Sequence, residues 1–127
     1  CIVALHNNTD GAYSVKSYLP AGDRHYDAKA VYANRKQDID DIALTTDSVL
    51  YQRMADKGYN SVWQNNKKAK RDGSLSIYCG EKDIRYINIE TQLGSLTQHI
   101  EMLEKLLAIL KEGKENDGVV KTDNAVK

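Results

Sequence analysis

Two side chains that can do chemistry follow short apolar runs at opposite ends of the chain. His6 follows the run IVAL at residues 2–5, and Glu90 ends the segment DIRYINIE. Such runs are typical of strands inside an α/β sheet, and open α/β sheets bind ligands beyond the carboxyl ends of their strands. If these two strands are parallel neighbours, the imidazole and the carboxyl group share one cleft.

The chemistry that this pair suggests is metal-assisted hydrolysis. Histidine is the commonest metal ligand, and glutamate is a competent general base. One histidine cannot hold a catalytic zinc ion, because such sites take about three protein ligands and a water molecule. From the residues alone, an alternative stays open: His6 is a hydrogen-bonded histidine at a sheet edge, and Glu90 is a solvated carboxylate.

The other histidines, the acidic run and the cysteines, which could also bind metals, are expected to have structural roles. His25 lies in the loop GDRHYD and His99 beside an apolar helical stripe, and neither has an acidic or histidine partner three or four residues on. The run DIDD at residues 38–41 lacks the glycine and the spacing of a calcium loop, so a solvated acidic turn is expected. Cys1 and Cys79 are the two cysteines, which excludes a disulfide framework and a cysteine-rich zinc site.

A basic loop and a serine complete the candidates. Residues 67–71 read KKAKR and form either an exposed loop or a clamp for a carboxylate or phosphate. No G-x-S-x-G motif is present, and Ser74 is interpreted as a helix N-cap. Cys79 is expected to be a small buried hydrophobic residue.

Composition restricts the class of protein. The chain has 127 residues, of which 41% are hydrophobic, and this suits one compact domain, placed here at residues 1–113. Eighteen basic and eighteen acidic side chains cancel, so no nucleic acid partner is expected. No apolar stretch approaches the roughly 20 residues of a membrane span. The charged tail at residues 114–127 is predicted to be disordered.

The elements that must position His6 and Glu90 alternate between strands and helices. A strand is predicted at residues 2–5, a strand or extended loop at 13–18, a helix at 48–57, a strand at 59–64, a helix at 75–82, a strand at 84–89 and a long helix at 95–112. Residues 23–44 are predicted to be irregular. This order predicts an α/β fold with a mostly parallel or mixed sheet flanked by helices. Alternation along the strand at 84–89 predicts that Tyr86, Asn88 and Glu90 share one face and that Ile87 and Ile89 share the other.

The order of these motifs resembles the carboxyl-terminal half of the zinc carboxypeptidase superfamily, which includes the succinylglutamate desuccinylase and aspartoacylase-like amidohydrolases. The segments that carry the resemblance are IVALHNN at the start and DGSLSIYCGEKDIRYINIE at residues 72–90. In that superfamily a strand ending in L-H supplies the third zinc ligand. A later G-S-[LI] helix start is followed by an apolar strand that ends in the catalytic glutamate. The resemblance extends from Cys1 to about Leu110.

The resemblance implies roles for three residues. His6 would be a ligand of one zinc ion, Glu90 the general base that activates zinc-bound water, and Lys68 a weak candidate for substrate binding, since it lies near the place of the family's mobile tyrosine. The family's H-x-x-E ligands and N-R pair, which precede the L-H strand, are missing from this sequence. The remaining zinc ligands are therefore expected outside this chain, from a missing amino-terminal segment or a second chain.

The function implied is zinc-dependent hydrolysis of an amide bond, of carboxypeptidase or amidohydrolase type. Its substrate would be a small peptide, such as a cell-wall peptide, or an acylated amino acid. The alternative is a non-catalytic α/β protein-interaction module, or an inactive fragment, whose long helix and basic loop engage a partner. The chain starts without Met, so it is expected to be processed, trimmed or cut from something longer. We leave the compartment open, with a preference for a periplasmic or secreted protein.

Overall fold

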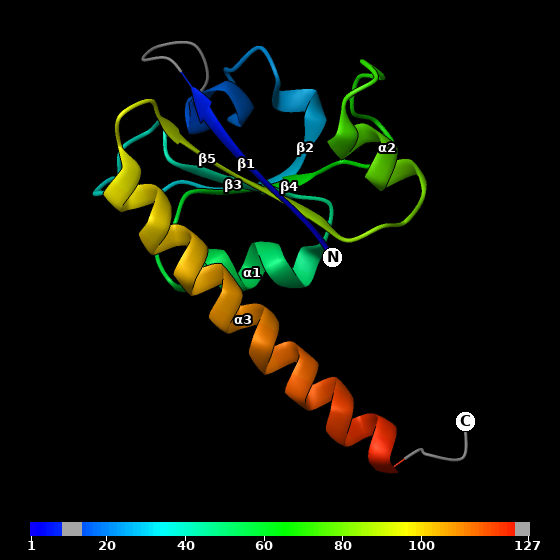
Figure 1. Cartoon of the computed structure of the whole chain (residues 1–127). Helices are drawn as coiled ribbons and strands as arrows, with labels where there is room; N and C mark the ends of the chain where they lie inside the picture. Colours follow the sequence, from blue (N-terminus) through cyan, green and yellow to red (C-terminus); the bar gives the residue numbers. More distant parts are fainter. Residues whose placement is uncertain (9–13, 124–127) are drawn as a thin grey trace.

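The computed structural model describes residues 1–8 and 14–123, the last ten of these by backbone alone. The strands are β1 (Ile2–Asn8), β2 (Ala28–Tyr32), β3 (Ile42–Thr45), β4 (Ser61–Gln64) and β5 (Tyr86–Gln92). The helices are the α-helices α1 (Ser48–Asp56), α2 (Leu75–Glu81) and α3 (Leu96–Asp123), and the 3-10 helices η1 (Val15–Tyr18) and η2 (His25–Asp27). The predicted α/β class is confirmed (Figure 1).

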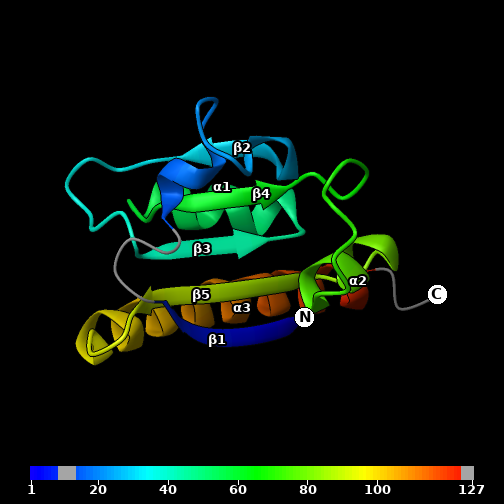
Figure 2. The same ribbon diagram turned by 90° about the horizontal axis from the view of Figure 1, so that it is seen from above.

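The five described strands form one mixed sheet in the order β1-β5-β3-β4-β2. β1 pairs with β5 and β3 with β4 in parallel, whereas the β3/β5 and β2/β4 pairs are antiparallel. Helices α1 and α3 cover one face of the sheet, and α2, η1 and η2 lie on the other side (Figures 1 and 2). The sheet thus separates a helix-covered face from a face that is only partly covered.

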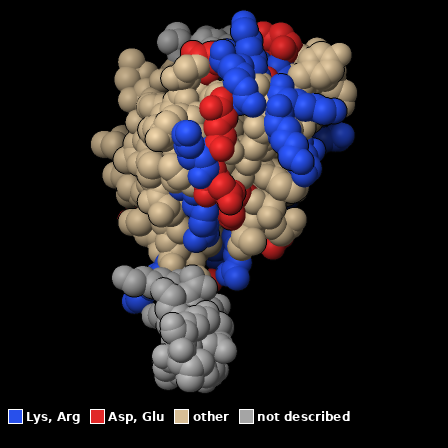
Figure 3. Space-filling model, turned by 90° about the vertical axis from the view of Figure 1, so that its right-hand side faces the viewer, with Lys and Arg blue, Asp and Glu red and all other residues tan. Residues whose placement is uncertain are grey.

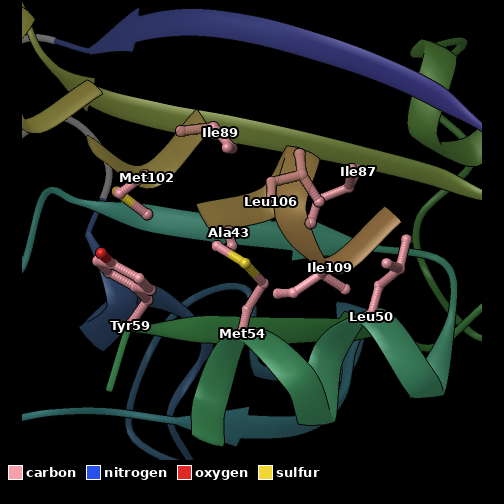
Figure 4. Close-up of a cluster of buried hydrophobic side chains, with 9 residues drawn as sticks. All are labelled: Ala43, Leu50, Met54, Tyr59, Ile87, Ile89, Met102, Leu106 and Ile109. Carbon is pink, nitrogen blue, oxygen red and sulfur yellow. The ribbon is translucent and has the colours of Figure 1, made fainter. Parts of the chain in front are cut away.

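The main core fills the space between the sheet and the helices α1 and α3 (Figure 4). Ile87 and Ile89 of β5 point into it, as do Met102 and Leu106 of α3, and all four side chains are fully buried. These α3 residues recur at helical spacing, which puts them on one face of the helix. The other members of this cluster are Ala43, Leu50, Met54, Tyr59 and Ile109.

A second, smaller cluster lies on the opposite face of the sheet. Val15 of η1 packs there against Ile42 and Val62, with Leu44 and Tyr18 beside them. Because side chains alternate along a strand, Ile42 and Leu44 point to this face while Ala43 points to the main core. The second cluster covers the β3/β4/β2 side of the sheet, and the β1/β5 side is left for the candidate site.

The helices agree with the sequence better than the strands do. Helix α1 starts after Asp47, whose Oδ2 accepts a hydrogen bond from the Leu50 N–H at 2.9 Å, and α2 starts after Ser74. The predicted strand or extended loop at residues 13–18 is wrong, because residues 15–18 form η1. The hydroxyl of Ser14 accepts from the Lys16 N–H at 3.2 Å, and the hydroxyl of Ser17 accepts from the Ser14 N–H at 3.4 Å, which closes a helical turn.

Two further predictions about the strands need correction. β1 was expected in the middle of the sheet with both faces covered, but it is an edge strand on which Leu5 and His6 are exposed. β2 and the first three residues of β3 fall within residues 23–44, which were predicted to be irregular. Both strands are short, and the sequence around them is polar.

Helix α3 is longer than the sequence predicts. Helix α3 continues past Gly113 to Asp123, beyond the predicted domain end. The side chains of residues 114–123 and the whole of residues 124–127 lie outside the described residues, so the disorder predicted for this tail stays a prediction. No helix among the described residues combines the length and the apolar character that crossing a bilayer requires.

Candidate functional site

His6 and Glu90 are direct neighbours across the parallel pair of β1 and β5. The strand register pairs Leu5 with Ile89 and His6 with Glu90. Adjacent strands lie about 4.8 Å apart, and paired residues project to the same face. Ile89 points into the main core, so His6 and Glu90 project to the opposite, partly covered face.

Both residues lie inside their strands, which corrects the expected position at the strand ends. β1 continues to Asn8 and β5 to Gln92. The site therefore lies over the face of the sheet rather than beyond its edge. The predicted alternation in β5 is confirmed, because Tyr86, Asn88 and Glu90 line the same cavity.

This cavity has a volume of about 230 Å³ and brings together segments far apart in the sequence. Its floor is the sheet, and its walls come from the η1–η2 region and from the segment that leads into α2. The lining residues are His6, Tyr18, Arg24, Ile42, Leu44, Asp72, Ser74, Leu75, Ser76, Tyr86, Asn88 and Glu90. Four of these side chains, His6, Arg24, Asp72 and Glu90, are ionisable groups other than tyrosine.

Burial controls the ionisation of Glu90. Removal from water raises the pKa of the Glu90 carboxyl above its ordinary value, and the nearby charges of His6 and Arg24 partly oppose this rise. Burial also raises the pKa of Tyr86, and the neighbouring Cys79 and Glu90 add to that effect. The site therefore holds a carboxyl group that accepts a proton more readily than a solvated glutamate does.

Asp72 is the second carboxylate of the cavity, and its surroundings act in the opposite direction. Hydrogen bonds from the side chain and the backbone of Ser74 lower the pKa of Asp72, with a smaller contribution from the charge of Arg24. The backbone bond runs from the Ser74 N–H to Asp72 Oδ1 at 2.9 Å. Two carboxyl groups with opposite pKa shifts thus line one cavity. In active sites, a carboxyl group with a raised pKa commonly takes up and releases protons, while one with a lowered pKa stays negatively charged.

Asn88 contributes an acceptor atom without a partner. Its Oδ1 is buried and makes no hydrogen bond. A buried polar atom left in this state costs about 1–3 kcal/mol. Asn88 lies between Tyr86 and Glu90 on the floor of the cavity, where a bound N–H or O–H group would satisfy this oxygen.

The substrate-binding candidate Lys68 lies outside this cavity. It lines an adjacent hollow together with Lys70 and Asp27, and that hollow shares Arg24 and Asp72 with the His6–Glu90 cavity. Arg24 and Asp72 were not predicted as site residues from the sequence. Arg24 occurs in the loop that was considered only for His25, whose Nδ1 is instead 2.8 Å from the Gly22 carbonyl oxygen.

The segment at residues 38–41 forms a turn, as predicted, but only Asp38 and Ile39 are exposed, so the prediction that it is solvated is wrong for its second half. Asp40 and Asp41 are buried. The Asp41 N–H donates to the Asp38 carbonyl at 3.1 Å, and the Nδ2 of the fully buried Asn60 donates to the Asp38 and Asp41 carbonyls at 2.9 and 3.0 Å. Burial, with the charges of Asp38 and Asp40, raises the pKa of Asp41 to about 6.

The described residues do not complete a zinc site by themselves. No group of three or more His, Cys, Asp or Glu side chains that could hold a metal ion occurs among residues 1–8 and 14–113, whose side chains the structure describes. His6 supplies one imidazole, and it lies on the edge strand, where its side chain is exposed. Any zinc ion at His6 would need further ligands from outside the described residues, since a catalytic site takes about three.

The charge distribution on the surface is mixed. On the face shown in Figure 3, basic and acidic side chains lie interleaved. Arg71 of the basic loop forms an ion pair with Glu81 of α2. This distribution matches the zero net charge of the chain.

Comparisons with known proteins add no relative. No protein-family model, curated protein or solved structure matches this chain.

Proposed function

We propose that this chain forms part of a zinc-dependent hydrolase of amide bonds, of carboxypeptidase or amidohydrolase type. The observation that carries the proposal is the pairing of His6 with Glu90 across β1 and β5, on one face of the sheet and at one cavity. The resemblance of residues 1–8 and 72–90 to the zinc carboxypeptidase superfamily supports it. In this proposal Glu90 is the general base, and His6 is one metal ligand.

Glu90 suits the role of a general base. A base works best when its pKa lies near the pH of the reaction, and burial moves the pKa of Glu90 upward in that direction. The neighbouring His6 and Arg24 act in the opposite direction and limit this rise in the pKa of Glu90. Once protonated, the carboxyl group can pass the proton to a leaving amine.

The metal ligands are incomplete within the residues whose side chains the structure describes. A zinc ion would supply Lewis-acid chemistry to such a reaction. His6 fits the role of one ligand because its imidazole is exposed on β1 beside Glu90. The remaining ligands would come from a segment or chain outside these residues, and we expect residues 1–127 alone to bind zinc weakly or not at all.

The cavity limits the size and the chemistry of the substrate. Its volume of about 230 Å³ lies below the roughly 300–1,000 Å³ of drug-sized ligand sites, which favours a small peptide or an acylated amino acid. The unsatisfied Oδ1 of Asn88 would accept a hydrogen bond from a substrate N–H group. Lys68 and Lys70 in the adjacent hollow provide positive charge for a substrate carboxylate that extends past Asp72.

The test is to measure zinc content and amide hydrolysis in the protein as its gene encodes it, with N-acyl amino acids and small peptides as substrates. We expect H6A to lose both zinc and activity. We expect E90Q to keep zinc and to lose activity by a factor of about 10²–10⁴, the contribution of a general base. H25A and E81Q are the matched controls, because neither residue lines the cavity. Wild-type zinc content and activity in H6A would refute the proposal.

The alternative function is a non-catalytic interaction module, and one observation favours it. Leu96, Ile100 and Leu107 of α3 are exposed, although large apolar side chains on a helix of a single domain are mostly buried. The module would be favoured if the protein neither bound zinc nor hydrolysed amide bonds and if it bound a partner through α3.

A further inference from the structure

The outer edge of β1 has free backbone groups in the described part of the chain. The Ile2 N–H donates to the Arg85 carbonyl at 2.8 Å, and the Asn8 carbonyl accepts from the Leu93 N–H at 2.9 Å, so the even-numbered residues of β1 bond toward β5. In a parallel pair the alternate residues point away from the partner strand. The N–H and C=O groups of Val3, Leu5 and Asn7 therefore point toward the open edge.

The two edges of this sheet differ in how they are protected against pairing. β2, the other edge, has five residues, an irregular register between Ala28 and Ala30, and a Lys29 ammonium 4.6 Å from the Trp63 ring centre. Bulges and lysines are the features by which edge strands avoid association. β1 has seven residues in unbroken register and contains no Lys, Arg, Asp, Glu, Pro or Gly. The β1 edge is therefore open to another strand.

Helix α3 exposes an apolar stripe on the same side of the molecule. Leu106 is fully buried, whereas Leu107 is 52% exposed. Around the helix, Leu107 lies about 100° to one side of Leu106, and Glu112 about 120° to the other side. Glu112 faces α1, because it pairs with Arg53 at 3.3 Å. Leu107 therefore faces away from α1, toward the margin formed by β1.

The stripe and the strand edge form one surface. Its α3 members are the exposed Leu96, Ile100 and Leu107 and the half-buried Leu103 and Leu110. Its β1 members on the same face of the sheet are Val3, which packs against the main core, and Leu5, which is 49% exposed. We call these seven residues and the free edge of β1 the β1–α3 surface.

We propose that the β1–α3 surface binds a second copy of this chain across a two-fold axis, with β1 antiparallel to β1 and α3 antiparallel to α3 of the partner subunit. This pairing does not depend on the proposed hydrolase function. An axis normal to the sheet, beside β1, places the two β1 strands about 4.8 Å apart. Helix α3 lies behind β5 and β1 in the view of Figure 2, so the same axis sets the two α3 helices side by side on one face of the paired sheets.

The charges on α3 favour a second copy over an unrelated partner. Glu104 and Lys111 are both exposed, and they flank Leu107 on the outer margin of the stripe, three and four residues away. In an antiparallel pair of α3 helices centred near Leu107, Glu104 faces Lys111 of the partner subunit, and the symmetry repeats this opposite-charge contact. β1 adds no carboxylate and no lysine or arginine that its own copy would repel. The surface is therefore self-complementary, as a two-fold interface requires.

The pairing would also enclose His6. The His6 side chain is exposed at the margin that β1 of the partner subunit would cover, on the face of the sheet that carries the cavity. Residues of the partner's β1 on that face would then border the cavity.

The first test is sedimentation equilibrium of residues 1–127 between about 1 and 200 μM. We expect twice the chain mass of 14.3 kDa at the upper concentrations. L107E should raise the dimer dissociation constant about 30-fold or more, as expected for a central interface side chain. V49E is the matched control, because Val49 is 54% exposed on α1, away from this surface. A wild-type monomer at all concentrations, or equal dissociation constants for L107E and V49E, would overturn the proposal.

Charge reversal separates self-pairing from nonspecific association through the apolar stripe. E104K and K111E should each raise the dissociation constant about threefold at low salt, and the double variant E104K/K111E should return it to near the wild-type value. Failure of the double variant to recover dimerisation rejects the antiparallel α3 pair.

Hydrogen exchange tests the strand pairing separately. The amides of Ile2, Ala4 and His6 bond within the monomer and should be protected at every concentration. Those of Val3, Leu5 and Asn7 should gain protection only as the dimer forms. Fast exchange of these three amides in a dimeric sample contradicts the β1 pairing.

Discussion

Replacing Asp41 by asparagine removes a buried carboxyl group whose ionisation opposes folding. Asp41 is 4% exposed, and burial together with Asp38 and Asp40 raises its pKa from 3.8 to about 6. Between these two pH values the folded protein binds a proton at Asp41 that the unfolded chain has released. By linkage, the free energy of unfolding falls as the pH rises through this interval. The contribution is fully present below about pH 4 and lost above about pH 6.

The magnitude follows from the size of the pKa elevation. A rise of about 2 pKa units corresponds to about 3 kcal/mol at 1.36 kcal/mol per unit. Asp41 also lines an open hollow with Asp38 and Lys36, so solvent reduces the effect, and we expect about 1–2 kcal/mol. The D41N side chain has the same shape and no charge. The unfolding free energy of wild type minus that of D41N should therefore fall by this amount between pH 4 and pH 7.

Urea unfolding followed by circular dichroism at pH 4, 5, 6 and 7 measures this difference. D56N is the control, because Asp56 is an exposed carboxylate at the end of α1, and its difference from wild type should change much less over the same interval. A difference between wild type and D41N that stays constant with pH, or that rises with pH, would refute the assignment of a raised pKa to Asp41.

Three further predictions concern the packing of the fold. L106A should lower the free energy of unfolding by about 2–5 kcal/mol in the same assay, because Leu106 is fully buried between α3 and the sheet, and a loss below about 1 kcal/mol would contradict that packing. N60A should cost at least about 2 kcal/mol, because the Asn60 side chain is fully buried and bonds the backbone of Asn34, Asp38 and Asp41; an unchanged urea midpoint would show that this turn holds without it. Cys79 should react with a thiol reagent only after unfolding, because it is fully buried and burial raises its pKa. The exposed Cys1 should react at once. Two fast-reacting thiols in the folded protein would contradict the structure.

The helices could be predicted from the sequence because their signals are local. Asp47 caps α1 and Gly58 follows its end with a φ of 88°, a conformation that glycine adopts readily. The stripe of α3 repeats every three to four residues, and this period depends only on neighbouring turns. These features act within a few residues, so they are readable without the rest of the fold.

The missed strands depend on contacts with distant segments. β3 has four residues, and three of them are buried only because β5 and β4 lie on either side. The run at residues 2–5 was read as a central strand because its four residues are apolar, yet β1 lies at the edge. Apolar composition indicates that a strand buries surface, and it leaves open whether the covering comes from this chain or from another.

Only the part of the candidate site that depends on local alternation could be predicted from the sequence. Alternation along β5 correctly placed Tyr86, Asn88 and Glu90 on one face, and the parallel pairing of β1 with β5 brought His6 beside Glu90. Arg24 and Asp72 were not predictable, because their segments reach the cavity only through the fold. The pKa of Glu90 is raised by burial, and His6 and Arg24 oppose that rise.

The most direct test of the coupling between His6 and Glu90 is to measure the pKa of the Glu90 carboxyl group in residues 1–127. The NMR chemical shift of its carboxyl carbon is followed as the pH changes. We expect this pKa to lie above the ordinary glutamate value in wild type, because the group is buried, and to rise further in H6A, because the charge of His6 opposes the elevation. H25A should leave it unchanged. A Glu90 pKa at or below the ordinary value, or one that does not respond to H6A, would contradict a shared cavity for these two groups.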